Sequence, residues 1–177
     1  MTAPGVPGLP DLGAGIARRH KGCKGANRPL GKSRGSRRTA RRALLCLLNK
    51  ARRAHGLRRL RANPHLLRAA ERHSRSMVLS GFFSHVDPGG LSSLDRIRLS
   101  GFLRHARAWA CGGEHRLRGG SDLEPAEHDA ELDEQRAAPS EHPHARLRAV
   151  GVGVVPGVPG GAGTAGGTYT TDFGFRS

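Results

Sequence analysis

Two amphipathic segments that follow one another early in the chain constrain its fold more than any other feature. The first runs from Thr39 to Gly56, where apolar residues recur at steps of three and four and basic residues occupy the other side. The expected inward residues are Leu44, Leu47, Leu48, Ala51 and Ala54. Thr39 is a suitable N-cap, and Gly56 followed by Leu57 suits a left-handed C-terminal residue with an apolar contact. This pattern predicts an amphipathic helix with one basic face.

The second segment predicts a helix that begins at Pro64. Asn63 is a suitable N-cap, Pro64 fits the first helical position, and Gly81 ends the run. The expected inner face consists of Leu67, Ala70, Ser74 and Met77. His73 lies one position from that face, so we expect it to be half-buried.

A further short helix and two strands are predicted in the rest of the chain. After the turn at residues 87–90, the sequence LSSLDRIRLSGF suits a helix capped by Ser92 or Ser93, with Leu94 and Ile97 inward, and ended by Gly101. Near the end, LRAVGVGVV and GTYTTDFG alternate and are rich in β-branched residues, and the loop between them allows an antiparallel pair. Because the helices come first and the strands later, we expect an α+β layered domain.

The charge of the chain is large and uneven. The formal net charge is +16, yet residues 1–110 hold 24 of the 30 lysines and arginines against four acids, whereas residues 111–147 hold nine acids against four bases. A basic balance of this size favours anionic partners such as nucleic acid, anionic lipid or wall polymers. The plainer interpretation is a composition in which arginine simply replaces lysine on solvated surfaces.

Composition also divides the chain into an arm and a domain. Residues 1–38 are rich in Gly, Pro and Arg without apolar periodicity, so we expect a disordered basic arm there and a single domain over residues 39–177. Residues 1–20 show no apolar core of a secretory signal, and the longest apolar run, ALLCLL at residues 43–48, is too short to cross a bilayer. The three cysteines match no metal-binding spacing.

An ordered set of short motifs resembles a known family. LLCLLNKARRAHGLRRLRANPHLLRAAERHSRSM, GFFSH, DRIRLSGF, GGE, RAVGVGV and TYTTDFG occur in the order found in bacterial members of the CAP superfamily, also called the SCP domain. That superfamily includes cysteine-rich secretory proteins, antigen 5 and plant pathogenesis-related proteins of group 1. The resemblance covers about residues 40–114 and 148–174, and it implies an α-β-α sandwich that is usually exported.

The resemblance also implies a cleft with two histidines and two acids that can hold a divalent metal such as zinc. His85 aligns with the first cleft histidine and Glu114 with a cleft glutamate; without the resemblance, His85 beside two phenylalanines would be interpreted as a packing residue. Imidazole and carboxylate suit zinc or proton transfer, but a protein metal site normally has three or four ligands. The second histidine has no aligned counterpart, and His142 and His144 are the nearest candidates.

The chain departs from the family between residues 115 and 147. This acidic segment lacks the tryptophan and the apolar helical face expected there, so we expect it to be mobile. Codons can be chosen for it such that reading one nucleotide later spells a segment resembling the family's, including SWMNSAPPHRNIL. We therefore interpret the segment as degenerate or frame-shifted, and the DNA sequence across codons 112–150 tests this hypothesis.

The function that follows from the resemblance is an extracellular ligand- or surface-interaction module with a vestigial His/Glu cleft and no established catalysis. Its partners would be lipid, cell wall or another anionic surface. The first alternative is a basic protein that binds nucleic acid non-specifically through the arm and the first helix. The second is a metal-dependent hydrolase that uses His85 and Glu114. Cys23 and Cys46 could form a disulfide, as in an exported domain, or stay reduced.

Overall fold

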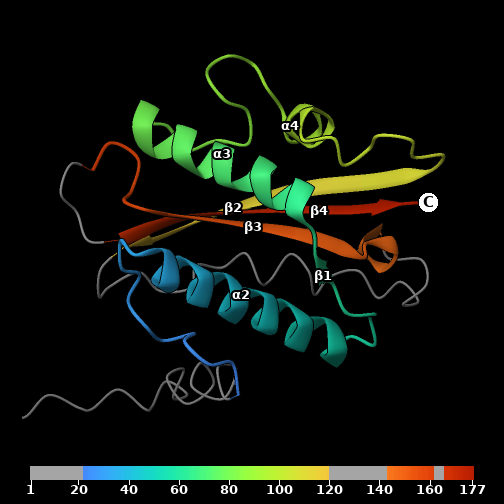
Figure 1. The fold of residues 1–177 in the computed structure, drawn as a ribbon, viewed down its shortest axis with the longest axis horizontal. Helices are drawn as coiled ribbons and strands as arrows, with labels where there is room; N and C mark the ends of the chain where they lie inside the picture. The colour runs from blue at the N-terminus through green and yellow to red at the C-terminus, as the bar shows by residue number, and fades with distance from the viewer. Residues whose placement is uncertain (1–21, 120–142, 162–165) are drawn as a thin grey trace, which may run out of the picture.

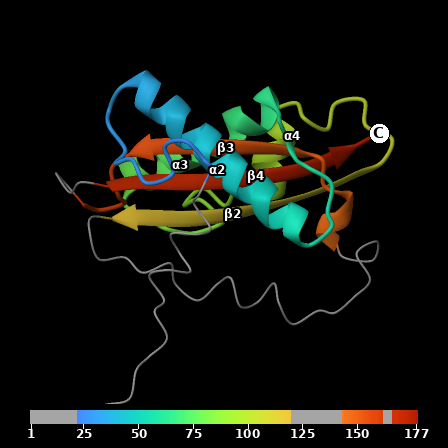
Figure 2. The same cartoon turned by 90° about the horizontal axis from the view of Figure 1, so that it is seen from below.

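A computed structural model describes residues 22–119, 143–161 and 166–177 as a sheet with helices on both faces (Figure 1). The α-helices are α2 (Arg34–Ala54), α3 (Pro64–Ser80) and α4 (Ser93–Leu99), and a 3-10 helix, η1, spans Pro143–Arg146. The strands are β1 (Arg61–Ala62), β2 (Trp109–Gly119), β3 (Ala149–Pro156) and β4 (Gly166–Arg176). One face of the sheet is covered by α3 and α4 and the other by α2, which crosses the strands in Figure 2. This arrangement is the α-β-α sandwich expected from the sequence.

The sheet has the strand order β1-β3-β4-β2. The predicted strands at the end of the chain form the antiparallel pair β3 and β4, so that prediction is confirmed. The sequence did not reveal β1, which pairs in parallel with the start of β3, or β2, which pairs antiparallel with the whole of β4. Residues 115–119 were assigned to the atypical acidic segment, but all five lie in β2. That segment is correspondingly shorter at its start, and residues 120–142 lie outside the described residues.

The first helix begins earlier than predicted. Ser33, not Thr39, is its N-cap, because the Ser33 side chain accepts a hydrogen bond from the Ser36 amide. The predicted boundary at residue 38 is therefore wrong: it falls inside α2, and residues 22–33 pack against the helix, with Cys23 and Ala26 buried. Residues 1–21 of the predicted arm lie outside the described residues.

The C-terminal end of α2 is fixed by polar contacts. Gly56 has the expected left-handed conformation (φ 68°), and the Leu57 amide donates to the Arg52 carbonyl at 2.8 Å. The buried Asn49 side chain both donates to and accepts from the backbone of Leu60, and Arg52 donates to the carbonyl of Leu147. These bonds hold α2 against the start of β1 and the segment before β3.

The second and third helices have the predicted caps. Asn63 caps α3 with Pro64 in its first turn, and Gly81 ends it in the left-handed conformation. Ser92 caps α4 in a reciprocal capping box with Asp95. The inner face of α3 is rotated slightly from the prediction, because Leu66 rather than Leu67 is fully buried and His73 is only 4% exposed.

Two hydrophobic cores lie on the two faces of the sheet. On the side of the sheet covered by α2, the residues Val150, Val152, Val154 and Phe173 pack with the leucines of that helix. On the other face, Leu66, Ile97 and Phe102 form a smaller core. The backbone of α3 lies so close to β3 that a Cβ atom at Gly151 or Gly153 would be 2.0–2.3 Å from helix backbone atoms. Glycine at these two positions therefore sets the distance between α3 and the sheet.

No helix among the described residues is long and apolar enough to span a membrane.

Candidate functional site

The loop that connects α3 to α4 carries His85. From α3, the ring of His73 donates through Nε2 to the carbonyl of Ser84 at 2.9 Å, since a carbonyl can only accept, and it contacts Phe82 edge-on at 5.8 Å. Burial lowers the pKa of His73, and the charge of Arg96 lowers it further. His73 is therefore a neutral donor that positions the loop.

Beneath the same loop lies a buried ion pair between α4 and β4. Arg96 donates through Nε and Nη2 to Oδ1 of Asp172 at 3.1 and 2.9 Å, and the two side chains are 7% and 0% exposed. A third nitrogen, Nη1, donates to the backbone carbonyl of His85 at 2.9 Å. Burial raises the pKa of Asp172 to about 6, while the hydrogen bonds and the charge of Arg96 act against that rise. The pair thus connects the His85 backbone to the centre of the sheet.

Two threonines extend this buried polar row along β4. The Ser74 hydroxyl donates to Oγ1 of Thr170 at 2.8 Å, and Thr168 donates to the carbonyl of Gly157 at 2.9 Å. Ser74, Thr168 and Thr170 are all fully buried. Because each of these buried groups has a partner inside the protein, the row is a rigid support for the loop above it.

His85 itself lies on the surface of this support. It is exposed, as are its neighbours Ser84 and Val86, and the turn that follows is closed by a hydrogen bond from the Leu91 amide to the Asp87 carboxylate at 2.9 Å. The structure therefore presents the His85 side chain on an anchored loop.

The other candidate site residues lie apart from this loop in the chain. Glu114 is in β2, where its backbone pairs with Thr171, whereas the residue that pairs with Asp172 is Gly113. Directly opposed residues of an antiparallel pair share a face, so position 114 shares its face with Thr171 and not with Asp172. His144 lies in η1, and His142 lies outside the described residues. The pairing of His85 with Glu114 stays a prediction.

A zinc site is not supported by the described part of the chain. No group of three or more His, Cys, Asp or Glu residues within it could hold a metal ion. The charged side chain hydrogen-bonded to the His85 backbone is a guanidinium cation, which repels a divalent metal. These residues do not fit the group that the family resemblance implies.

Sequence reasoning missed the Arg96–Asp172 pair, although a signal for it existed. Asp172 is the one charged residue in the strand segment TYTTDFG. In a sandwich with helices on both faces of the sheet, Asp172 and its neighbour Phe173 both point inward, to opposite faces. A carboxylate at an inward strand position requires a buried partner. The position of Arg96, immediately before the inward Ile97 of a short helix, could have suggested that partner.

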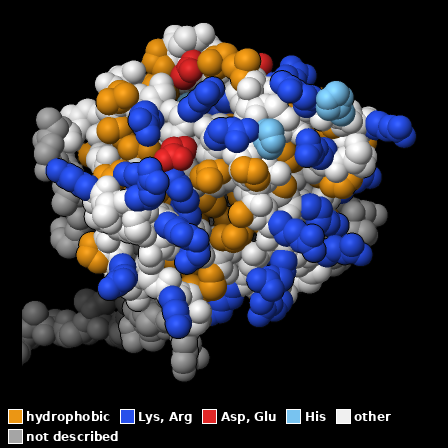
Figure 3. Space-filling view, viewed as in Figure 1, with side chains coloured by type: hydrophobic (Ala, Val, Ile, Leu, Met, Phe, Trp, Pro, Cys, Tyr) orange, Lys and Arg blue, Asp and Glu red, His pale blue; other side chains and the backbone are white. Residues whose placement is uncertain are grey.

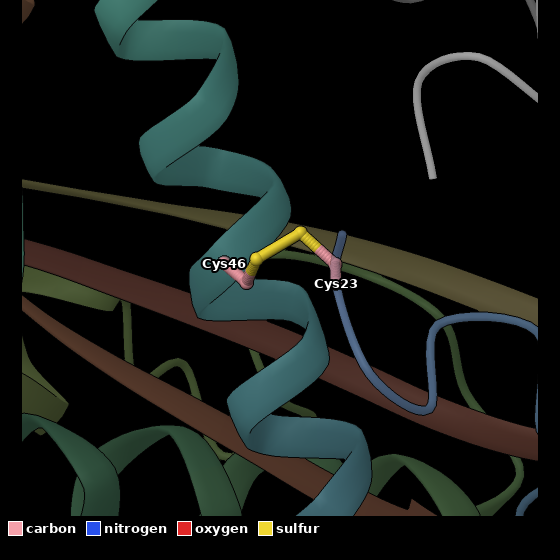
Figure 4. The surroundings of a disulfide bond; sticks show 2 residues. All are labelled: Cys23 and Cys46. Carbon is pink, nitrogen blue, oxygen red and sulfur yellow. A yellow bond between two sulfur atoms is a disulfide. The ribbon is translucent and has the colours of Figure 1, made fainter. Parts of the chain in front are cut away.

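Two of the three cysteines form a disulfide, and the third is a free thiol. Cys23 and Cys46 form a disulfide that attaches the segment before α2 to the middle of that helix (Figure 4). Cys111 on β2 is a half-buried free thiol whose pKa is raised by burial. A raised pKa keeps this thiol protonated and unreactive.

The outer side of α2 and its flanking segments form a basic surface, called the α2 face below. Every charged residue between Gly22 and Leu60 is a lysine or an arginine. The exposed members are Lys24, Arg28, Lys32, Arg34, Arg38, Arg42, Lys50, Arg53, Arg58 and Arg59. Figure 3 shows basic side chains far outnumbering acidic ones on one side of the molecule, including the half over α2.

Comparisons with known proteins agree with this architecture. Residues 45–116 match CAP, the cysteine-rich secretory protein family. No curated protein gives a significant match to the chain.

Two solved structures are similar to this fold. One is an extracellular protein containing an SCP domain from Bacillus anthracis str. Ames, with 17% identity and a TM-score of 0.50 over 82% of this chain; the match spans 44% of that protein's chain. The other is an outer surface protein from Borrelia burgdorferi, with 14% identity, a TM-score of 0.48, and coverage of 76% of this chain and 90% of that one. At this identity, the Bacillus structure shows a shared fold.

Proposed function

We propose that this chain, whose residues 45–116 match the CAP family, acts outside the cell as a ligand- or surface-interaction module for phosphate-bearing polymers or surfaces. Two observations support an extracellular location. The Bacillus anthracis protein of the same fold is described as extracellular, and Cys23 and Cys46 form a disulfide, a bond that persists in oxidising compartments.

The observation that carries the proposal is the α2 face. Residues 22–60 themselves contain no acid, and the ion pair of Arg41 with Glu71 of α3 involves none of the exposed members. The helix α2 is held by the disulfide at one side and by the Asn49 and Arg52 contacts at its end. Arginines carried on a fixed helix keep a constant spacing, and their guanidinium groups suit the bidentate binding of phosphates. Such binding weakens steeply with salt, because each phosphate contact releases a counterion.

A charge-reversal experiment tests the α2 face. The variant Arg38→Glu/Arg42→Glu changes two exposed residues of α2, and the control Arg72→Glu/Arg75→Glu makes the same charge change on exposed positions of α3. Binding to phosphatidylglycerol vesicles and to soluble polyphosphate is measured at several salt concentrations, with neutral phosphatidylcholine vesicles as a blank. At about 1 kcal/mol per basic residue, loss of the two arginines alone should weaken binding on the order of thirtyfold, and the two introduced acids should weaken it further.

The control variant should lose much less affinity. Equal losses in both variants would mean that binding depends on net charge alone, and an absence of binding to both probes would refute the proposal. Deleting residues 1–38 is unsuitable for this purpose, because that deletion removes Cys23 and the first turn of α2.

Non-specific binding of nucleic acid is the second candidate, and the same acid-free surface favours it. Phosphate contacts carry no sequence information, so the affinity would be similar for unrelated DNA sequences. A competition between duplex DNA and polyphosphate for the chain distinguishes the two candidates, since DNA should win at equal phosphate concentration only if it is the preferred partner. A role for His85 and Glu114 in metal-dependent hydrolysis stays a prediction, which zinc binding that is lost in His85→Ala would support.

A further inference from the structure

An open pocket of about 340 Å³ lies where the start of α3 meets the ends of three strands. Three arginines line it: Arg61 of β1, Arg148 just before β3, and Arg176 at the end of β4. None of its described lining residues is acidic. Three positive charges around one concave surface make a strongly positive potential there.

Two of these arginines are held in place by the protein itself. Arg176 donates through Nη1 to the carbonyl of Phe102 at 2.8 Å, and its guanidinium lies over the Phe102 ring at 5.3 Å. Arg148 donates through Nη1 to the carbonyl of Leu147 at 3.0 Å. A guanidinium has five N–H donors, so each retains the capacity to bind an anion after this contact. Both groups are therefore preorganised for a ligand.

The floor of the pocket is apolar. Phe102, which is 1% exposed, lies there with Ala149 and Phe175. Gly174 allows the ring to approach β4, since a Cβ atom at this position would be 2.3 Å from the ring. The pocket also contains Asn63, the N-cap of α3. The side chain of Asn63 accepts hydrogen bonds from the amides of His65 and Leu66. These two amides are therefore not offered to a ligand, and the helix acts on an anion through the positive end of its dipole.

We propose that this pocket binds one small anion that has a phosphate or carboxylate group and a short apolar body. The arginines would bind the oxygens in the forked geometry that guanidinium groups favour, and the apolar body would lie against Ala149 and Phe175, which are partly exposed in the lining. The volume is at the lower end of the range for small-molecule sites, about 300–1,000 Å³. This site is separate from the α2 face, and it goes beyond the proposed function because it is saturable with one ligand per chain.

Calorimetry on the full chain tests the pocket with three soluble probes: butyl phosphate, butyrate and inorganic phosphate. We expect butyl phosphate to bind with a stoichiometry of one and about tenfold more tightly than inorganic phosphate, because its alkyl group removes apolar surface from water. The variant Arg61→Ala/Arg176→Ala should bind butyl phosphate at least about tenfold more weakly, as expected for loss of charged hydrogen bonds. The control Arg58→Ala/Arg59→Ala removes two exposed arginines outside the pocket and should bind normally.

A single variant, Arg61→Ala, guards against misfolding, since Arg61 is exposed. Its loss of butyl phosphate binding, with an unchanged thermal transition, would support the pocket. Equal affinity for butyl phosphate and inorganic phosphate, or equal losses in the pocket and control variants, would overturn it. If the chain binds phosphatidylglycerol vesicles but not butyl phosphate, the pocket proposal fails and the α2 face proposal stands. If it binds butyl phosphate but not the vesicles, the pocket proposal stands and the α2 face proposal fails.

Discussion

Removing the disulfide should destabilise the chain by an amount set by the length of the loop that it closes. The variant Cys23→Ser/Cys46→Ser opens a loop with a sequence separation of 23 residues. In the chain-entropy account, closing a loop of this length removes about 11 cal/mol/K from the unfolded state, or about 3.4 kcal/mol at 25 °C. That is a large part of the roughly 5–15 kcal/mol that stabilises a typical domain.

The assay is thermal and urea unfolding of the oxidised protein and the variant. A loss of about 3.4 kcal/mol corresponds to a decrease in Tm of roughly 7–14 °C for a chain of this length. Cys111→Ser is the matched control, because it replaces a half-buried thiol that is in no disulfide, and its effect should be much smaller. Limited proteolysis should cut the double variant first within residues 22–33, which the bridge holds against α2. An unchanged Tm in the double variant would refute the reasoning, since it would mean that this segment does not depend on its covalent attachment.

Three further predictions concern the site and the sheet. Because the pKa of Asp172 is raised to about 6 from an ordinary value near 4, its contribution to stability is fully present below pH ~4 and is lost as pH rises through about 6. Urea unfolding between pH 4.5 and 7.5 should show this loss in the wild type relative to Asp172→Asn, and parallel curves would contradict it. The variant Arg96→Met leaves the buried Asp172 without its partner and should lower the free energy of unfolding by about 3–5 kcal/mol above pH 7. Because Arg96 also binds the His85 carbonyl, backbone hydrogen exchange in residues 81–91 should become faster. Unchanged exchange would mean that Arg96 does not anchor this loop. Gly153→Ala should cost at least 1–3 kcal/mol because its Cβ would be 2.3 Å from the Ala70 carbonyl oxygen, whereas Gly35→Ala, with no atom closer than 3.9 Å, should be neutral or stabilising in thermal unfolding.

The parts of the fold that the sequence could predict are those determined by local chemistry. Asn63, Pro64 and Gly81 define α3 because caps and left-handed residues act within one turn of the helix. The predicted start of α2 was too late. The segment before Thr39 is rich in Gly and Arg, so its composition does not reveal the Ser33 cap or the packing of Cys23 and Ala26 against the helix. Those contacts depend on a covalent link to Cys46, 23 residues away.

Non-local pairing explains what the sequence could not predict. The strand β2 has few β-branched residues, and it forms because β4 offers a full row of backbone partners from Gly166 to Arg176. Similarly, β1 is only two residues long and exists through its parallel pairing with Ala149 and Val150. The candidate site depended on the same kind of information, because non-local contacts decide that position 114 pairs with Thr171 and that Asp172 binds Arg96.

The position of the Arg96–Asp172 pair favours recognition over metal chemistry at the His85 loop. A metal site would require at least one further donor near the imidazole, and the nearest buried carboxylate on that side of the sheet is already engaged by a guanidinium with two nitrogens. Drawing Asp172 away to a metal would leave Arg96 charged and buried, at a cost of several kcal/mol that metal binding would have to offset. The same pair fixes the His85 carbonyl, so the loop keeps its shape without any bound ion. The His85 side chain is thus exposed on a loop whose backbone is held from below.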